Sequence, residues 1–92
     1  MPEKDDMRII SLLARSKRRI KVLKSLENED KIPSRISKEI EDNNNHVSKY
    51  LKSLKEVALV ECLNEEDKRY RFYSITDKGK YYLDKVEKDY ND

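Results

Sequence analysis

The most regular pattern of hydrophobic and polar positions in the chain lies between residues 43 and 63. Its first part has apolar residues at the i, i+3, i+4, i+7 spacing of one buried helix face, namely Val47, Tyr50, Leu51, Leu54 and Ala58. The opposite face and its flanks collect polar residues: Asn45, Lys49, Lys52 and Glu56, flanked by His46, Ser48 and Ser53. The spacing predicts an amphipathic helix over residues 45–56 with a polar outer face that carries lysines.

A shorter helix is expected just before this one. It begins at Pro33, since the fixed φ of proline suits a first helical turn and its missing amide is not needed there. Ser37 is small enough to let the two helices cross closely. Residues 41–45 form the turn between them. Asn43 or Asn44 is expected to serve as turn residue and cap, because asparagine tolerates the left-handed conformation and its side chain caps helices.

A hairpin and a last helix are expected after residue 58. Residues 59–63 and 69–75 are predicted strands, because side chains in the second of them alternate with period two around the loop 64–68. This loop lacks glycine, and its tip carries three acidic residues that phosphate would repel. Thr76 is predicted to cap the final helix. Gly79, in the first turn of that helix, is expected to pack closely against the hairpin or another helix.

The amino-terminal part has two predicted helices. Residues 1–6 are polar and expected to be frayed, whereas residues 7–15 have apolar side chains around well over half of the helix circumference. A helix of a small domain usually needs an apolar stripe of about 100°. The excess predicts a second partner, most simply the same helix of another subunit. The alternative is a helix wedged deeply in its own core.

The second helix, over residues 16–27, is expected to start at Ser16, whose hydroxyl can accept a hydrogen bond from a free amide of the first turn. Basic residues surround its outer side. They form either a solvated face or a binding site: Lys17, Arg18, Arg19, Lys21 and Lys24.

Taken in chain order, these elements match one architecture. Residues 1–92 form a single α+β domain, mostly α: a winged helix-turn-helix with the two motif helices at 33–56. A two-stranded β-hairpin wing covers 59–75, and a C-terminal helix covers 76–90. In this plan the second motif helix enters the major groove of DNA.

The segment HVSKYLKSLKEVALVECLNEEDKRYRFYSITDKGKYYL, residues 46–83, resembles the core of small prokaryotic, especially archaeal, winged-helix regulators of the ArsR/MarR type. It contains a Val-Ser-x-x-Leu recognition helix, a basic wing and an Ile-Thr-x-x-Gly opening of the last helix. Ala58 stands where such proteins have the glycine of Gly-Leu-Val, and Tyr70 takes a wing position where they tend to have glycine. If Ala58 keeps a left-handed conformation, alanine costs about 1 kcal/mol relative to glycine.

The resemblance implies binding of double-stranded DNA by a transcription regulator. Asn45 faces outward at the first turn, and an asparagine amide can pair with adenine. His46 is expected to contact a phosphate or base, or else to be a capping-turn residue in solvent. The start of the first motif helix and the basic part of the wing are expected on the DNA backbone. The full set of candidate DNA contacts is Ser34, Arg35, Asn45, His46, Ser48, Lys49, Lys52, Ser53, Lys68, Arg69 and Arg71.

The resemblance also implies a homodimer. In ArsR-type relatives the first and last helices form the dimer, and both are apolar in this chain. The residues expected at this interface are Met7, Ile10, Leu13, Ala14, Tyr82, Leu83, Val86 and Tyr90.

Composition permits DNA binding without demanding it. The chain of 92 residues is 43% charged and 36% hydrophobic, but the periodicity of its apolar residues indicates a folded domain rather than disorder. The net charge is only +2. It is unevenly spread, since residues 31–58 carry 6 basic and 4 acidic side chains whereas residues 59–92 carry 7 and 9.

No catalytic, metal or cofactor site is predicted. The one histidine and the one cysteine, Cys62, fall on separate elements, and no phosphate-binding glycine loop is present. A lone cysteine suits a reducing cytoplasm, and the apolar runs are too short to cross a membrane or to form a signal peptide. The alternative function is a protein-interaction module that uses Tyr81, Tyr82 and Tyr90, because fold does not settle function.

Overall fold

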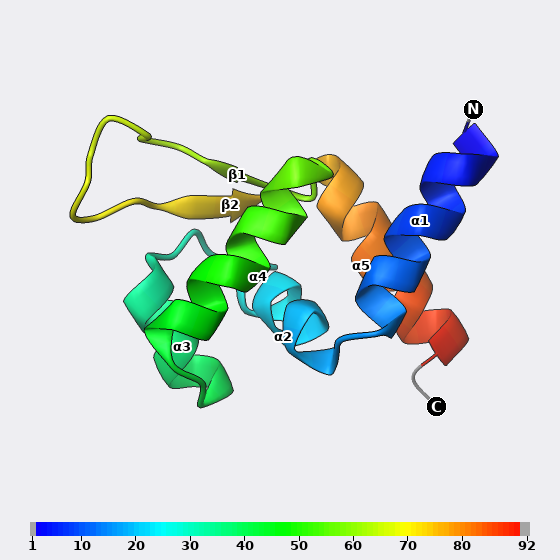
Figure 1. The fold of residues 1–92 in the computed structure, drawn as a ribbon, viewed down its shortest axis with the longest axis horizontal. Coiled ribbons are helices and arrows are strands. Elements are labelled where there is room, and N and C mark those ends of the chain that lie inside the picture. The colour runs from blue at the N-terminus through cyan, green and yellow to red at the C-terminus, as the bar shows by residue number, and fades with distance from the viewer. Residues whose placement is uncertain (1, 91–92) are drawn as a thin grey trace.

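The computed structural model describes residues 2–90 of the chain, with side chains described for residues 6–88 (Figure 1). The helices are α1 (Pro2–Ala14), α2 (Lys17–Ser25), α3 (Pro33–Ile40), α4 (Asn44–Glu56) and α5 (Asp77–Tyr90). The strands β1 (Val60–Cys62) and β2 (Tyr73–Ile75) pair antiparallel, with Val60 opposite Ile75 and Cys62 opposite Tyr73. The predicted winged helix-turn-helix architecture is confirmed.

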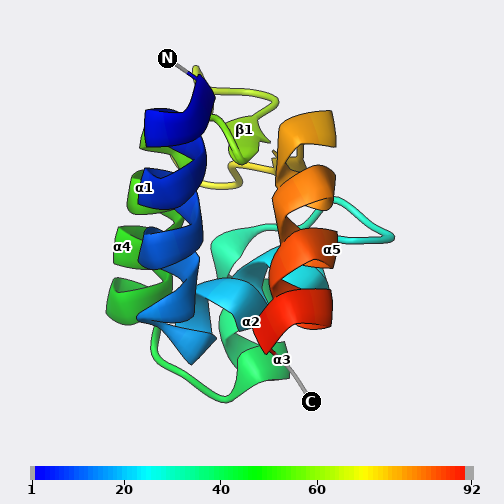
Figure 2. The same ribbon diagram turned by 90° about the vertical axis from the view of Figure 1, so that its right-hand side faces the viewer.

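Helix α2 lies at the centre of the helical body and packs against each of the other helices. Helices α3 and α4 cross on one side of it, whereas α1 and α5 lie side by side on another (Figure 2). The hairpin projects away from this body beside α4 (Figure 1). Each of these helices and strands contributes side chains to the core, whereas the outer side of α3 and the distal part of the wing do not. The fully covered side chains include Leu13, Leu23, Ile36, Leu51 and Leu83.

Local sequence rules explain how the helices begin. The hydroxyl of Ser16 accepts a hydrogen bond from the Arg19 amide at 3.2 Å, and Asn43 Oδ1 accepts one from the His46 amide at 2.8 Å. The hydroxyl of Thr76 likewise accepts from the Gly79 amide at 2.9 Å. All three caps agree with the predictions from sequence, with Asn43 rather than Asn44 capping α4.

The turn between α3 and α4 differs from the prediction in one respect. Its left-handed residue is Glu41, with φ of 57°, and neither Asn43 nor Asn44 adopts this conformation. Asn43 has φ of −89° and ψ of 159°, because an N-cap residue needs an extended backbone. The chain must therefore reverse before Asn43, immediately after α3 ends.

The other end of α4 follows the prediction. Ala58 has a left-handed backbone conformation, with φ of 62°.

The residue after it, Leu59, passes close to Gly79 of α5. A Cβ at position 79 would lie 2.1 Å from the carbonyl oxygen of Leu59 and 2.7 Å from Cγ1 of Ile75. Glycine is therefore required where α5 crosses the base of the wing.

Several boundaries differ from the predicted ones. Helix α1 begins at Pro2, so residues 2–6 are helical rather than frayed; Met1 lies outside the described residues. The reason is an attachment to α5, since the Asp6 carboxylate accepts a hydrogen bond from the Tyr82 hydroxyl and pairs with Lys85 at 3.1 Å. Helix α2 ends at Ser25, two residues before the predicted end, and α4 begins at Asn44, one residue early.

The strands are shorter than predicted, because side chains replace regular pairing in the wing. After the backbone bond from the Leu63 amide to the Phe72 carbonyl, the Asn64 side chain bridges the loop. Its amide donates to the Tyr70 carbonyl, and its oxygen accepts from the Phe72 amide, both at 2.8 Å. The period-two pattern of residues 69–72 thus lies in a loop closed by Asn64.

Candidate nucleic-acid interface

Helix α4 presents a polar face to solvent because its apolar face is used by the core. Val47, Leu51 and Leu54 are completely or almost completely buried. Outward from them the helix has two flanks. The wing-side flank consists of Ser48, Lys52 and Lys55, and the turn-side flank consists of His46, Tyr50 and Ser53. Between the flanks, Asn45 and Lys49 are exposed.

The wing-side flank and the wing enclose a groove of about 420 Å³, which we call the wing groove. It contains a high density of positive charge. Its lining residues are Pro33, Ser48, Lys52, Lys55, Lys68, Arg69, Arg71 and Tyr73. The structure therefore brings together five of the residues predicted from sequence, Ser48 and Lys52 from α4 and three cations from the wing. The prediction missed Lys55, which the i, i+3 spacing from Lys52 could have revealed.

The acidic tip of the wing is partly neutralised by the fold itself. Glu65 forms an ion pair with Lys55, which lowers the pKa of the Glu65 carboxyl and raises that of Lys55. Asp67 accepts hydrogen bonds from the backbone amides of Tyr70 and Arg69, at 2.9 and 2.8 Å, and these bonds lower its pKa. These two carboxylates hold the shape of the wing rather than facing solvent unpaired.

A buried lysine attaches the wing to α3. Lys31 is 8% exposed, and its ammonium lies 2.8 Å from a carboxylate oxygen of Glu39. Its backbone exchanges two hydrogen bonds with Tyr73, at 2.9 and 3.1 Å. Nearby on α3, the predicted backbone contacts Ser34 and Arg35 are exposed, and the Arg35 guanidinium lies 4.0 Å from Glu39. No feature of the sequence marked Lys31, because its partners lie on other elements.

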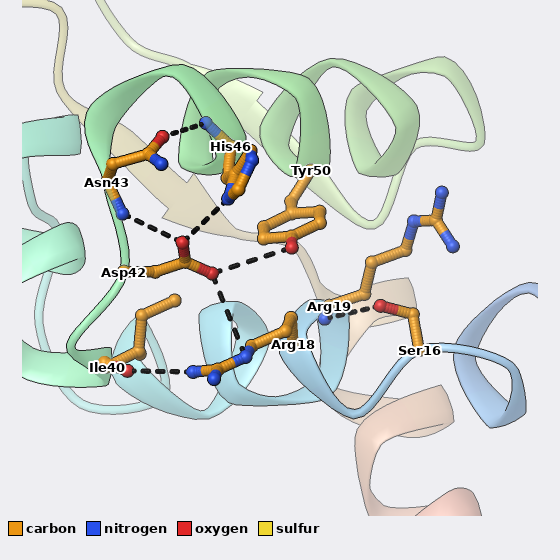
Figure 3. A network of polar contacts seen from close by, with 8 residues as sticks. All are labelled: Ser16, Arg18, Arg19, Ile40, Asp42, Asn43, His46 and Tyr50. Carbon is orange, nitrogen blue, oxygen red and sulfur yellow. Dashed lines mark hydrogen bonds and ion pairs between the residues drawn. The ribbon is translucent and has the colours of Figure 1, made fainter.

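The turn-side flank is organised by one carboxylate, that of Asp42, whose side chain is 11% exposed (Figure 3). It accepts hydrogen bonds at 2.8 Å from Nδ1 of His46 and from the Asn43 amide. The Tyr50 hydroxyl lies 3.5 Å away, and Nε of Arg18 lies 3.7 Å away. The hydrogen bond from His46 is the largest cause of a lowered Asp42 pKa, followed by that from the Asn43 amide.

The basic residues of α2 also bind partners within the chain. Arg18 donates to the Ile40 carbonyl at 3.1 Å, at the end of α3 (Figure 3). Arg19 donates to the Ser53 hydroxyl at 3.0 Å, and Ser53 in turn donates to the Tyr50 carbonyl at 2.8 Å. Lys24 lies 3.0 Å from Glu87 of α5. Much of the basic cluster is therefore a set of links between helices, and the Ser53 hydroxyl is engaged with α2 instead of facing outward.

The cations around the wing groove are differently placed. Lys49, Lys52, Lys68 and Arg69 are exposed and have no ion-pair partner among residues 6–88. Arg71 is exposed, and its Nε donates a hydrogen bond to the Asp67 backbone carbonyl at 3.0 Å. Its guanidinium charge therefore has no carboxylate partner among residues 6–88. This arrangement suits contacts with phosphates, which need unpaired cations at the surface.

The predicted dimer residues divide into two groups. Leu13, Tyr82, Leu83 and Val86 are at most 7% exposed and lie in the core of the single chain. Met7 is 73% exposed, Ala14 is exposed and Ile10 is partly buried against the core. The Tyr90 side chain lies outside the described side chains. Of the tyrosines considered for a protein interface, Tyr81 is 57% exposed.

Over residues 2–90, no helix has both the length and the apolar character needed to cross a membrane. Within the same described part, no three histidine, cysteine or acidic side chains are gathered as a metal site would require.

Three packed helices that contain a helix-turn-helix, followed by a hairpin wing, define the winged-helix class. The chain belongs to the winged helix-turn-helix family, because the family model of that description matches residues 15–91. No curated protein matches the chain by sequence.

Solved structures of transcription regulators share the fold. The homodimeric winged helix-turn-helix DNA-binding domain Mb0332 from Mycobacterium bovis, a possible ArsR-family regulator, has a TM-score of 0.74 at 21% identity. The alignment covers 96% of this chain and 82% of Mb0332. MarR from E. coli has a TM-score of 0.70 at 22% identity, over 95% of this chain and 68% of MarR.

A mutant of ZitR from Lactococcus lactis has a TM-score of 0.69 at 20% identity, over 79% of this chain. This chain spans about half of ZitR, 51% of its length. The predicted resemblance to winged-helix proteins of the ArsR/MarR type is confirmed at the level of the fold.

Proposed function

We propose that this protein is a small transcription regulator that binds double-stranded DNA in a sequence-specific manner. Helix α4 lies in the major groove, and the protein acts by binding in the cytoplasm, without catalysis. The observation that carries the proposal is the wing groove: unpaired cations from α4 and the wing converge beside an exposed polar helix face. This combination provides both a side that reads base edges and a side that holds phosphates.

In this proposal the candidate residues have different roles. Asn45 and Lys49 lie between the two flanks of α4 and contact base edges. Lys52, Lys68 and Arg71 contact the phosphates of one strand along the wing groove, as exposed unpaired cations do. Ser34 and Arg35, at the exposed start of α3, contact the opposite backbone.

The functional unit is a homodimer that places two α4 helices about one helical turn of DNA apart. Mb0332, which shares the fold, is homodimeric. In this chain the surface of α1 and α5 supplies the contact through Met7, Ile10, Ala14 and Tyr81, because the other apolar residues of these helices already fill the core.

The test is selection from random duplex DNA at two salt concentrations, with the wild type, with Lys49→Ala/Lys52→Ala and with a control. The control, Lys78→Ala/Lys80→Ala, removes the same charge from exposed positions on α5. We expect an enriched palindrome for the wild type and the control, and its loss in the α4 variant. The affinity for DNA should fall about tenfold or more over a modest increase in salt concentration.

Two other outcomes would contradict the proposal. Equal loss in both double variants would mean that only net charge matters. Absence of binding at low salt would favour the alternative protein-interaction module, whose contact through Tyr81 would depend little on salt.

A further inference from the structure

The tautomer of His46 is determined by its neighbour. Nδ1 of His46 lies 2.8 Å from Oδ1 of Asp42 (Figure 3). An aspartate carboxyl is ordinarily ionised near neutral pH, and the Asn43 amide and Arg18 beside Asp42 favour this charged form, which has no proton to donate. The proton between the two atoms therefore belongs to Nδ1 of the imidazole.

A neutral imidazole has one donor nitrogen and one acceptor nitrogen. With the proton on Nδ1, Nε2 carries a lone pair. The His46 side chain is 54% exposed and lies in the first turn of α4, and Nε2 has no hydrogen-bond partner among residues 6–88. The recognition helix thus presents a free acceptor at its amino-terminal end, where such helices contact base edges.

The groups that face His46 come from three elements. Asp42 lies in the turn, Arg18 reaches the same carboxylate from α2, and Tyr50 lies one turn along α4 with its ring centroid 6.3 Å from that of His46. Arg18 is in turn held by the Ile40 carbonyl at the end of α3. Asp42 is therefore fixed from several sides and can orient the imidazole without moving.

We propose that Asp42 is a positioning residue that makes His46 a specificity determinant, reading an exocyclic amino group of adenine or cytosine in the major groove. This inference rests on the proposed function. Among base edges in the major groove, adenine N6 and cytosine N4 are donors, whereas guanine N7 and O6 and thymine O4 are acceptors. A lone pair on Nε2 accepts from the first two and is repelled by the others.

One test needs no DNA. His46 is the one histidine of the chain, so its ring nitrogens give unambiguous NMR signals. At about pH 8 we expect the Nδ1–H tautomer in the wild type and a shift towards Nε2–H in Asp42→Asn, whose side chain can donate. A wild-type ring in the Nε2–H form would overturn the inference, whatever the protein binds.

The second test is the base preference in selected duplexes at about pH 8. For the wild type we expect adenine or cytosine at one position of each half-site, favoured roughly three- to tenfold, as one net hydrogen bond provides. This preference should disappear in His46→Ala and weaken in Asp42→Asn, while the other positions of the motif are retained.

The outcomes separate this inference from the proposed function. An enriched motif that is the same in the wild type and His46→Ala would overturn the role of His46 and leave the proposed function intact. A preference lost in His46→Ala but fully kept in Asp42→Asn would overturn the role of Asp42. Absence of any motif would overturn both proposals.

Discussion

Positive charge is used in opposite ways on the two sides of α4. Beside the turn-side flank, Arg18 and Arg19 of α2 bind partners within the chain and connect α2 to the turn and to α4. Along the wing groove, Lys52 of α4 and Lys68 and Arg69 of the wing are exposed and have no ion-pair partner among residues 6–88. In the sequence the two groups look alike. The difference teaches that a basic cluster is available to a ligand only where the acceptors of the chain itself are not within reach.

The cause of the difference is the position of the nearby acceptors. Arg18 lies against the carboxyl end of α3, where backbone carbonyls lack helical partners, and against the Asp42 carboxylate. In the wing, Asp67 is occupied by backbone amides and Glu65 by Lys55. The remaining wing cations are therefore left without a carboxylate partner.

Gly79→Ala is expected to have the largest effect, because it disturbs the base of the wing while leaving the turn-side flank untouched. The added Cβ would meet the Leu59 carbonyl oxygen at 2.1 Å, and backbone cannot move aside as a flexible side chain can. We expect a loss of about 3 kcal/mol in the free energy of unfolding, at the upper end for overpacking. Urea unfolding measures it, and a variant as stable as the wild type would show that the wing sits differently on α5.

Removing equal charge from the two sides of α4 comes next. Lys52→Ala/Arg71→Ala should weaken DNA binding roughly tenfold and lower the slope of log affinity against log salt by about two, one for each lost phosphate contact. Arg18→Ala/Arg19→Ala should lower the melting temperature and leave that slope nearly unchanged. Titrations at several salt concentrations measure both. Equal slopes of log affinity against log salt for the two variants would contradict the distinction between the two sides of α4.

The two residues with left-handed backbone, Glu41 before α4 and Ala58 after it, allow a test with a smaller expected effect. Ala58→Gly, beside the wing, should stabilise the protein by about 1 kcal/mol, because glycine adopts the left-handed region without the cost of a Cβ. For a domain of this size this corresponds to an increase of about 4–8 °C in the melting temperature. Glu41→Gly, in the turn, is the matched variant and should also raise it. A fall in either variant would mean that the side chain contributes more than the backbone strain costs.

The smallest expected effect is on the stability of the protein at acidic pH. The lowered pKa of Asp42 means that the folded state favours its carboxylate, chiefly through the hydrogen bond from His46. This stabilisation is fully present above the ordinary carboxyl value of 3.8 and is lost as the pH falls through the lower folded value. Below pH 3.8 the melting temperature of the wild type should therefore fall more steeply than that of Asp42→Asn. Parallel curves would contradict the assigned role of Asp42.

The parts of the fold that were predictable from sequence depend on neighbours along the chain. The caps Ser16, Asn43 and Thr76 act on amides three residues away, and the roles of Ala58 and Gly79 follow from rules for single backbone positions. The polar face of α4 follows from periodicity alone.

The parts that escaped prediction depend on residues distant in sequence. Arg18 and Asp42 are brought together only when α2 packs against the turn, and Lys31 meets Tyr73 only when the wing folds back. The outward direction of Ser53 on a helical wheel was overruled by Arg19 of α2. The wing strands were shortened because the Asn64 side chain bonds to backbone groups that regular pairing would otherwise use.

The most direct test of the central claim is a map of amide chemical shifts as a selected duplex is added to the labelled protein. We predict the largest changes over residues 44–52 of α4 and 68–71 of the wing, with small changes on α1 and at Arg19. Changes confined to α1 and α5 around Met7 and Tyr81, with α4 and the wing unchanged, would contradict the claim. They would show that the exposed cations of the wing groove do not form the contact with DNA.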